Sequence, residues 1–125
     1  DVPGKARIGP LICYEDLLAS MSRQATLAGA EVLLNILNDA WYGDTAAPYQ
    51  HQALALWRAV ENRRYLLRGS NSGVTSIIDA AGRVVGFRRW EGSGLQPGGS
   101  IQFVLTVASL GSRVTRVELF VEARP

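Results

Sequence analysis

Two short apolar segments separated by a helical pattern place the strongest constraint on the fold. RIGPLICY (7–14) and VLLNILN (32–38) are apolar runs bounded by turn residues, as is typical of buried strands. Between them, apolar residues recur at helical spacing: Leu17, Leu18, Met21, Ala25 and Ala28. Gly29 is a plausible helix end, and Pro10 is expected at the start of its strand or at a bulge. This order predicts a β-α-β unit with a sheet covered by helices.

The same alternation continues toward the C-terminus. Residues 38–48 are rich in Asn, Asp, Gly and Pro and are predicted to form a loop. A helix is expected over 50–64, with Arg58, Glu61 and Arg64 on its wetter side. Strands are expected at 65–71, 73–79 and 83–87, the last two joined as a hairpin. The predicted order is therefore β-α-β-α-β-β, an α/β fold, followed by a poorly defined tail with strands at 101–110 and 112–125.

Composition excludes several classes of protein. The 125 residues suit about one domain, and 47% hydrophobic against 19% charged residues excludes a disordered chain. A net charge of +2 is too small to indicate nucleic-acid binding, and no apolar run is long enough to span a membrane. The start of the chain lacks the apolar region of a signal peptide and an initiator Met, so we expect a piece of a longer protein. A single cysteine excludes an internal disulfide, one cysteine and one histidine argue against a zinc site from this chain alone, and no cofactor or metal is predicted.

Cys13 is the strongest candidate for chemistry, because it lies at a predicted strand-to-helix junction. The partial positive charge at a helix start favours the thiolate, which is the nucleophilic form. The backbone N–H of Tyr14 would lie beside it and could donate to an oxyanion. The alternative is a buried cysteine that acts only as a small apolar side chain.

Other candidate sites are weaker. GSNSG (69–73) has Asn71 where a nucleophile elbow needs serine, and GSGLQPG (92–98) lacks the spacing of a phosphate-binding loop. His51 could act as a base, but no sequence feature places it near Cys13, so we expect it to cap or pack at a helix start. The arginines of 58–68 and the pair Arg88–Arg89 are expected to be solvated or paired rather than to form a binding patch.

Five motifs in order resemble the C-terminal half of the nitrilase-like domain of the apolipoprotein N-acyltransferases. These are C-Y-E at 13–15, N-D-A-W-Y-G at 38–43, P-x-Q-H at 48–51, R-A-x-E-x-x-R at 58–64 and R-x-x-N-x-G-x-T at 68–75. This family is the membrane branch of the carbon–nitrogen hydrolase superfamily, and the resemblance covers roughly residues 7–87. It implies part of an αββα sandwich, with residues 1–90 as the C-terminal half of the domain and 91–125 as a divergent or uncertain tail.

The resemblance also implies a cysteine acyltransferase. Cys13 matches the nucleophile, which would take an acyl group from a phospholipid as a thioester and pass it to the N-terminal amine of a diacylglyceryl-cysteine apolipoprotein. The family uses a Glu–Lys–Cys triad, whose Glu acts as general base and acid and whose Lys helps to hold the oxyanion together with the Tyr14 N–H. The implied location is the bacterial inner membrane, with the catalytic domain on the periplasmic side and attached to the membrane through segments absent here.

Other residues match family positions with supporting roles. Glu15 matches a second carboxylate that would orient the site; its alternative is a charge in a first helical turn. The side chain of Tyr14 could be required for activity or simply pack. Trp41 lies in a loop that borders the pocket in the family and could contact an acyl chain or lipid, or merely anchor the loop. We expect mainly buried, hydrogen-bonded scaffolding roles for Asn38, Asp39, His51, Arg58, Glu61, Arg64, Arg68, Asn71 and Thr75.

The chain departs from the family upstream of the nucleophile. The twelve residues before Cys13 contain no Glu, and Lys5 is expected in the loop entering the same strand, so the Lys role is not assigned to it. We therefore expect the isolated chain to expose apolar sheet surface and an unpaired strand edge, and to be marginally stable and inactive. Two other functions stay open: a soluble amidase or nitrilase that uses water as acceptor, and an inactive truncated interaction module.

Overall fold

The computed structural model describes residues 6–90, 100–107 and 115–122, and its centre is a five-stranded mixed sheet. The strands follow the order of the sequence: β1 (Ile8–Ile12), β2 (Val32–Leu37), β3 (Tyr65–Ser70), β4 (Gly73–Ile78) and β5 (Val84–Trp90). The first three pair in parallel, whereas β3, β4 and β5 pair antiparallel. The predicted α/β fold and the hairpin of the last two strands are confirmed.

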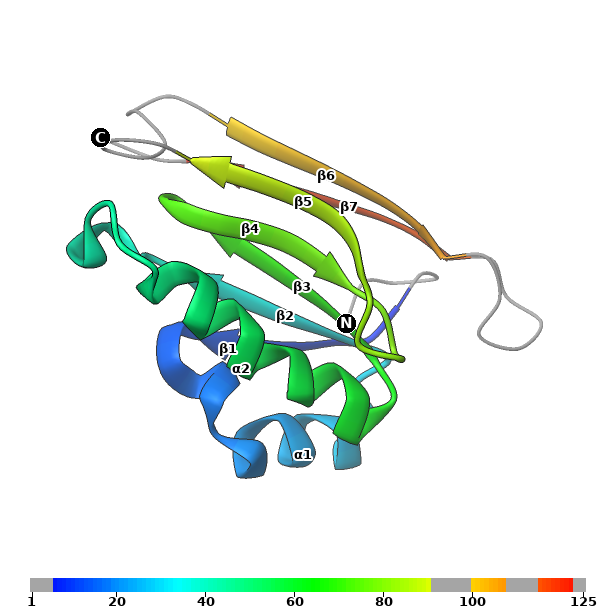
Figure 1. The fold of residues 1–125 in the computed structure, drawn as a ribbon. Helices are drawn as coiled ribbons and strands as arrows, with labels where there is room; N and C mark the ends of the chain where they lie inside the picture. Colours follow the sequence, from blue (N-terminus) through cyan, green and yellow to red (C-terminus); the bar gives the residue numbers. More distant parts are fainter. Residues whose placement is uncertain (1–5, 91–99, 108–114, 123–125) are drawn as a thin grey trace.

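Two helices connect the parallel strands and lie on the same side of the sheet (Figure 1). The short 3-10 helix η1 (Cys13–Leu17) follows β1 and leads into α1 (Ala19–Leu27). A second 3-10 helix, η2 (Ala40–Tyr42), lies in the predicted loop, and α2 (Ala47–Asn62) follows it. Pro48 is tolerated in the first turn of α2, where its missing N–H would have no helical partner.

The main core lies between the sheet and the two helices. It is built from fully buried apolar side chains of every layer: Leu11, Ala30, Leu33, Ala55, Ala59, Leu66 and Ile78. Gly9 allows α1 to approach β1 closely, because a Cβ atom there would lie 2.8 Å from that of Ala30 and 2.9 Å from that of Ala25. A smaller cluster of Val32, Leu34 and Leu67 lies on the helix-free face of the sheet.

Three local expectations are wrong. Pro10 lies in the middle of β1 rather than at its start, because β1 is an edge strand, and an edge strand tolerates a residue that lacks an N–H. The first strand ends at Ile12, so Cys13 belongs to η1. Arg58 is buried rather than on the wet side of α2, because its Nη1 atom donates to the carbonyl of Leu17 at 2.7 Å.

The tail contains β6 (Ser100–Val107) and β7 (Thr115–Glu122), which pair antiparallel in a separate two-stranded sheet. Two strands were expected in this region, so that part of the prediction is confirmed. Lys5 and residues 91–99 lie outside the described residues.

Candidate active site

Cys13 lies where the edge strand β1 turns into η1, at the end of the sheet where the three parallel strands finish. Its thiol is free, and the residue is partly exposed. Its backbone has φ 51°, the left-handed region that non-glycine residues seldom adopt and that costs about 1 kcal/mol or more. Such a conformation persists only when the surroundings hold it, and outliers of this kind gather at functional sites.

The predicted helix start at this junction is only partly correct. Residues 13–17 form a single 3-10 turn, and Leu18 in extended conformation separates it from α1, which begins at Ala19. The α-helical dipole expected beside the sulfur is therefore absent from this position, and Cys13 begins only one short turn.

Two side chains hold the Cys13 turn from either end. Glu15 Oε2 accepts a hydrogen bond from the backbone N–H of Ile12 at 2.7 Å. On the other side of Cys13, the Nδ2 atom of Asn35, from the neighbouring strand β2, donates to the Cys13 carbonyl at 3.1 Å. Glu15 thus fixes the end of β1 just before the nucleophile position, and Asn35 fixes the peptide just after it.

Asp16 is the centre of a buried polar network directly behind this turn. Its carboxylate is 0% exposed and accepts from three side chains. Nε of Arg68 lies 2.9 Å from Oδ2, Nε2 of His51 lies 2.8 Å from Oδ1, and Asn35 donates a further short bond to Oδ2. Because Arg68 is itself fully buried, this pairing compensates charges that would otherwise be costly in the core.

His51 is held from both ring nitrogens. Its Nδ1 lies 3.1 Å from Oδ1 of Asp39, opposite the bond to Asp16, and its ring stacks on Tyr14 with 5.1 Å between centroids. Burial opposes the charged imidazolium, but the hydrogen bonds to Asp16 and Asp39 outweigh it and raise the pKa of His51 to about 9. At neutral pH both nitrogens therefore donate, one to each carboxylate.

His51 packs near the start of α2, which is one of the two alternatives expected for it, but its closeness to the nucleophile turn was not foreseen. The residue is buried and contacts the nucleophile turn through Asp16 and Tyr14, instead of capping the start of α2. The helical turns of α2 bring it to the sheet end where β1 and β2 finish. Its hydrogen-bonded, buried state agrees with the scaffolding role expected from the family motif.

The other residues that match family motifs fall into three groups. Buried side chains, as expected of scaffolding, are Asp39, Arg58, Arg68 and Thr75. The exposed ones are Asn38, whose Oδ1 accepts from the Ala40 N–H, and Glu61, which pairs with Arg58. Arg64 is partly buried and donates to the carbonyl of Ala30, and Asn71 is also partly buried.

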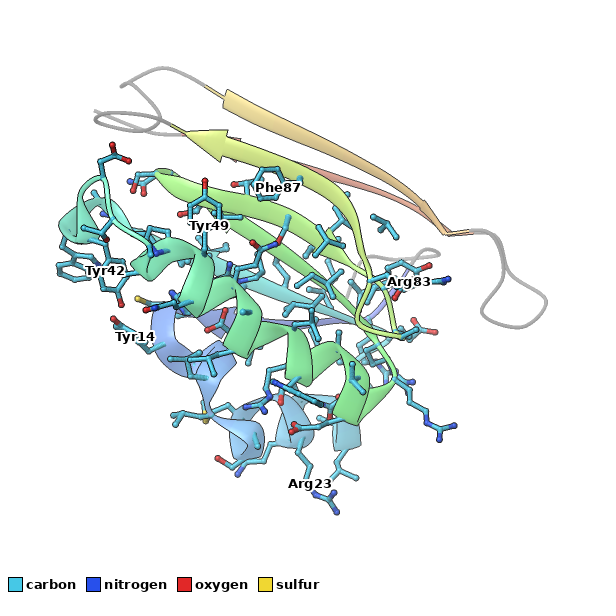
Figure 2. The ribbon with its side chains drawn as sticks, in the orientation of Figure 1. Tyr14, Arg23, Tyr42, Tyr49, Arg83 and Phe87 are labelled. Carbon is cyan, nitrogen blue, oxygen red and sulfur yellow. The ribbon has the colours of Figure 1, made fainter. Side chains whose placement is uncertain are left out.

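The loop between β2 and α2 carries Trp41 near the same end of the sheet. Its side chain is 75% exposed, so it does not anchor the loop by burial. Figure 2 shows Tyr14 and Tyr42 at this end of the molecule, with Arg83 at the opposite end. Tyr14 is itself half exposed above the His51 ring. Aromatic side chains from η1 and from the loop between β2 and α2 therefore lie at the end of the molecule that carries Cys13.

Asp16 and Asn35 are the site residues that the sequence reasoning missed. A signal for Asn35 was present, because it is the one polar residue inside the apolar strand VLLNIL, and a polar side chain buried in a sheet needs a hydrogen-bond partner. Asp16 directly follows the C-Y-E motif but gave no sign of being buried.

Neither a metal site nor a membrane-spanning helix is found in the described part of the chain. No group of three or more His, Cys, Asp or Glu residues there is arranged to hold a metal ion. None of the helices within the described ranges combines the length and the apolar character needed to cross a bilayer.

Comparison with solved structures identifies the class of fold. Nit3 from Saccharomyces cerevisiae, a member of the nitrilase superfamily, matches with a TM-score of 0.57 at 21% identity over 66% of this chain and 33% of that one. A variant of the amidase from Nesterenkonia sp. AN1 matches with a TM-score of 0.57 at 27% identity over 69% of this chain and 35% of the amidase. In that structure the acetamide moiety of fluoroacetamide is covalently added at the active-site cysteine.

The sequence then places the chain within a family. The model for carbon–nitrogen hydrolases matches residues 1–107, and the chain belongs to this family. Among curated relatives, an apolipoprotein N-acyltransferase of Geobacter metallireducens is 51% identical over 83 residues, which is 66% of this chain and 16% of that protein. The matched part of the chain thus spans about a sixth of the relative's length, and the expected resemblance is confirmed.

Proposed function

We propose that the chain is part of a lipoprotein N-acyltransferase and that Cys13 is its nucleophile. The observation that carries the proposal is the position of Cys13: a partly exposed residue in a left-handed turn at the end of β1, in a segment similar to curated apolipoprotein N-acyltransferases. The covalent adduct at the cysteine of the related amidase supports the same role for the thiol of this family member.

In the proposed reaction the Cys13 thiolate attacks the ester carbonyl of a phospholipid. The Sγ–C bond forms, the carbonyl π electrons move to the oxygen, and collapse of this intermediate breaks the ester C–O bond. The lysophospholipid leaves after taking a proton. The amine of a diacylglyceryl-cysteine apolipoprotein then attacks the thioester, so that an amide forms, the C–S bond breaks and the thiol is regenerated.

The residues around Cys13 have separate tasks in this proposal. The Tyr14 N–H donates to the oxyanion. Glu15 is a supporting carboxylate that holds the end of β1 through the Ile12 N–H, and so keeps Cys13 in register. Trp41, exposed on the neighbouring loop, offers an apolar surface for the acyl chain or lipid. The general base and the lysine of the family triad come from segments other than residues 6–90.

The proposed partners and location follow from the same relatives. The donor is a phospholipid and the acceptor an apolipoprotein, at the bacterial inner membrane with the catalytic domain on the periplasmic side. Residues 1–90 form the C-terminal half of the hydrolase domain in this proposal, and residues 91–125 a divergent tail.

The test is a chimera in which this chain replaces the matched segment of the Geobacter metallireducens protein. After incubation with phospholipid vesicles, mass spectrometry is expected to find a fatty acyl group on Cys13, and addition of an apolipoprotein peptide is expected to remove it as an amide. The Cys13→Ala variant should carry no acyl group. Arg23→Ala, on the exposed side of α1, is the matched control and should behave as the parent.

The outcomes separate this proposal from the alternatives. Acyl transfer that persists in Cys13→Ala would contradict the nucleophile assignment. An acyl-enzyme that discharges equally fast in water and in the presence of the peptide amine would instead favour a hydrolase of the amidase kind. A thiol with the reactivity of free cysteine and no adduct would favour an interaction module.

A further inference from the structure

Asn35 contacts the one peptide group that joins the nucleophile position to the proposed oxyanion donor. It lies in the middle of β2, is fully buried, and donates from Nδ2 to the Cys13 carbonyl at 3.1 Å. The register of the parallel strands pairs it with Leu11 on β1, two residues before the nucleophile. The Asn35 side chain therefore contacts the peptide that follows Cys13 from the neighbouring strand, on the buried side of the turn.

The geometry of a peptide group converts this contact into a direction for the Tyr14 N–H. In a trans peptide the C=O and N–H bonds lie in one plane and point in opposite directions. Since the Cys13 carbonyl points inward to buried Asn35, the N–H of Tyr14 in the same peptide points outward, away from the polar network. Tyr14 is in the first turn of η1, where N–H groups have no helical acceptor, so this donor is available to a substrate oxygen.

The orientation of the Asn35 amide is fixed by its surroundings. Its Nδ2 faces two acceptors, the Cys13 carbonyl and Oδ2 of Asp16. Reversing the amide would place its oxygen against both of them. Asp16 is in turn held in place by its contacts with Arg68 and His51, so the partner that orients Asn35 is itself fixed.

We propose that Asn35 is a positioning residue, which aims the Tyr14 N–H at the oxyanion by holding the Cys13 carbonyl inward. It does not touch the substrate. This inference rests on the proposed function of Cys13, because a donor needs an oxyanion to stabilise. Its effect is specific to reactions that pass through a tetrahedral intermediate.

The experiment compares two reactions of the single thiol in the 125-residue chain. With p-nitrophenyl acetate, the Cys13 thiolate adds to the carbonyl, an oxyanion forms, and its collapse forms the thioester and expels p-nitrophenolate. With iodoacetamide, the thiolate forms an S–C bond at a saturated carbon while the C–I bond breaks and iodide leaves, so no oxyanion is involved. The ratio of the two rates isolates the oxyanion donor from the reactivity of the thiol.

Asn35→Leu keeps the volume of the side chain but removes the amide. We expect its acylation rate to fall about tenfold or more relative to its alkylation rate, because a misdirected donor loses part of the effect of an oxyanion-hole hydrogen bond. Ser76→Ala is the control, since Ser76 lies across β3 in the same row, and its hydroxyl has no partner among the described residues. The control should leave the ratio unchanged.

The results distinguish this inference from the proposed function. Equal losses in both rates for Asn35→Leu, or no loss in either, would overturn the positioning role while leaving Cys13 as nucleophile. A parent chain that is alkylated but never acylated at Cys13 would overturn the positioning role, since no oxyanion would be stabilised, whereas the nucleophile assignment is decided by acylation of the chimera.

A second measurement decides the geometry even if Asn35→Leu does not fold. In the parent chain labelled with ¹³C and ¹⁵N, we expect a scalar coupling across the hydrogen bond between Nδ2 of Asn35 and the carbonyl carbon of Cys13. We also expect the Tyr14 amide to exchange with deuterium as an unprotected group. A missing coupling together with a protected Tyr14 amide would overturn the inference.

Discussion

The Nε2 atom of His51 lies 2.8 Å from Oδ1 of Asp16, although 35 positions separate the two residues in the chain. This contact joins α2 to the turn that carries Cys13. Through its other nitrogen, His51 also binds Asp39, in the loop that carries Trp41. One imidazolium thus connects the nucleophile turn, the α2 helix and the aromatic loop.

The first prediction concerns the pH dependence of stability. The pKa of His51 rises from 6.5 in the unfolded chain to about 9 in the folded one, so the folded state binds the extra proton between these values. The contribution to stability is therefore complete below pH 6.5 and is lost as the pH rises through 9. Urea denaturation should show a decrease in the free energy of unfolding on the order of 3 kcal/mol between pH 6 and pH 10.

The histidine can be observed directly because the chain contains only one. In a ¹⁵N NMR titration both ring nitrogens should keep their imidazolium shifts at pH 7.5. A ring that titrates near 6.5 would contradict the two hydrogen bonds from His51 to Asp16 and Asp39. His51→Gln should remove the pH-dependent part of the stability that this residue supplies.

Asp16→Asn is predicted to be strongly destabilising. It removes the charge that pairs with fully buried Arg68, and breaking a buried ion pair from one side costs about 3–5 kcal/mol. It should also lower the pKa of His51, because one of the two hydrogen bonds to a carboxylate is lost. Glu61→Gln, which breaks the more exposed pair with Arg58, should cost less than about 1 kcal/mol in the same denaturation experiment.

The stability of the chain should tolerate Glu15→Gln but decrease with Glu15→Ala. Glu15→Gln keeps an oxygen that can accept from the Ile12 N–H, whereas Glu15→Ala leaves this N–H without its partner. We expect Glu15→Ala to cost about 1 kcal/mol of stability, as loss of a cap does, and Glu15→Gln to cost less than half of that. Rates of Cys13 alkylation measured on both variants should follow the same order. A large loss of alkylation in Glu15→Gln would show that the charge itself is needed.

Trp41→Ala should leave stability almost unchanged, within about 0.5 kcal/mol, because the side chain is largely exposed. If the indole contacts an acyl chain, the variant chimera should show a raised KM for phospholipid vesicles with an unaltered rate of Cys13 alkylation. Leu27→Ala, at the exposed end of α1, is a control for the loss of an exposed apolar side chain. An unchanged KM would exclude a substrate-binding role for Trp41.

Periodicity predicted the order of strands and helices along the chain, since apolar runs and helical spacing report directly which face is buried. The ends of the elements were harder to predict. Cys13 was assigned to a strand-to-helix junction correctly, but the single 3-10 turn and the extended Leu18 were not foreseen. They depend on Asn35 and Glu15, whose hydrogen bonds hold a left-handed residue that local preference disfavours.

Buried roles were expected for His51 and Arg68, but the connections of the buried network could not be predicted from the sequence because its members come from four separate elements. Asp16 is in η1, Asn35 in β2, His51 in α2 and Arg68 in β3. Arg68 and Asp16 each look like surface residues when read alone. The register of β2 and β3 pairs Asn35 with Arg68, and this places the Arg68 guanidinium beside the Asp16 carboxylate in the core.

The mutual dependence of these buried charges has an evolutionary consequence. Replacement of Asp16 during evolution would leave a guanidinium and an imidazolium in the interior without their shared carboxylate. Substitution at position 16 should therefore be accompanied by substitution at positions 51 and 68. Divergent sequences of this kind should therefore show correlated substitution at the three sites, with mixed combinations purged by selection for folding.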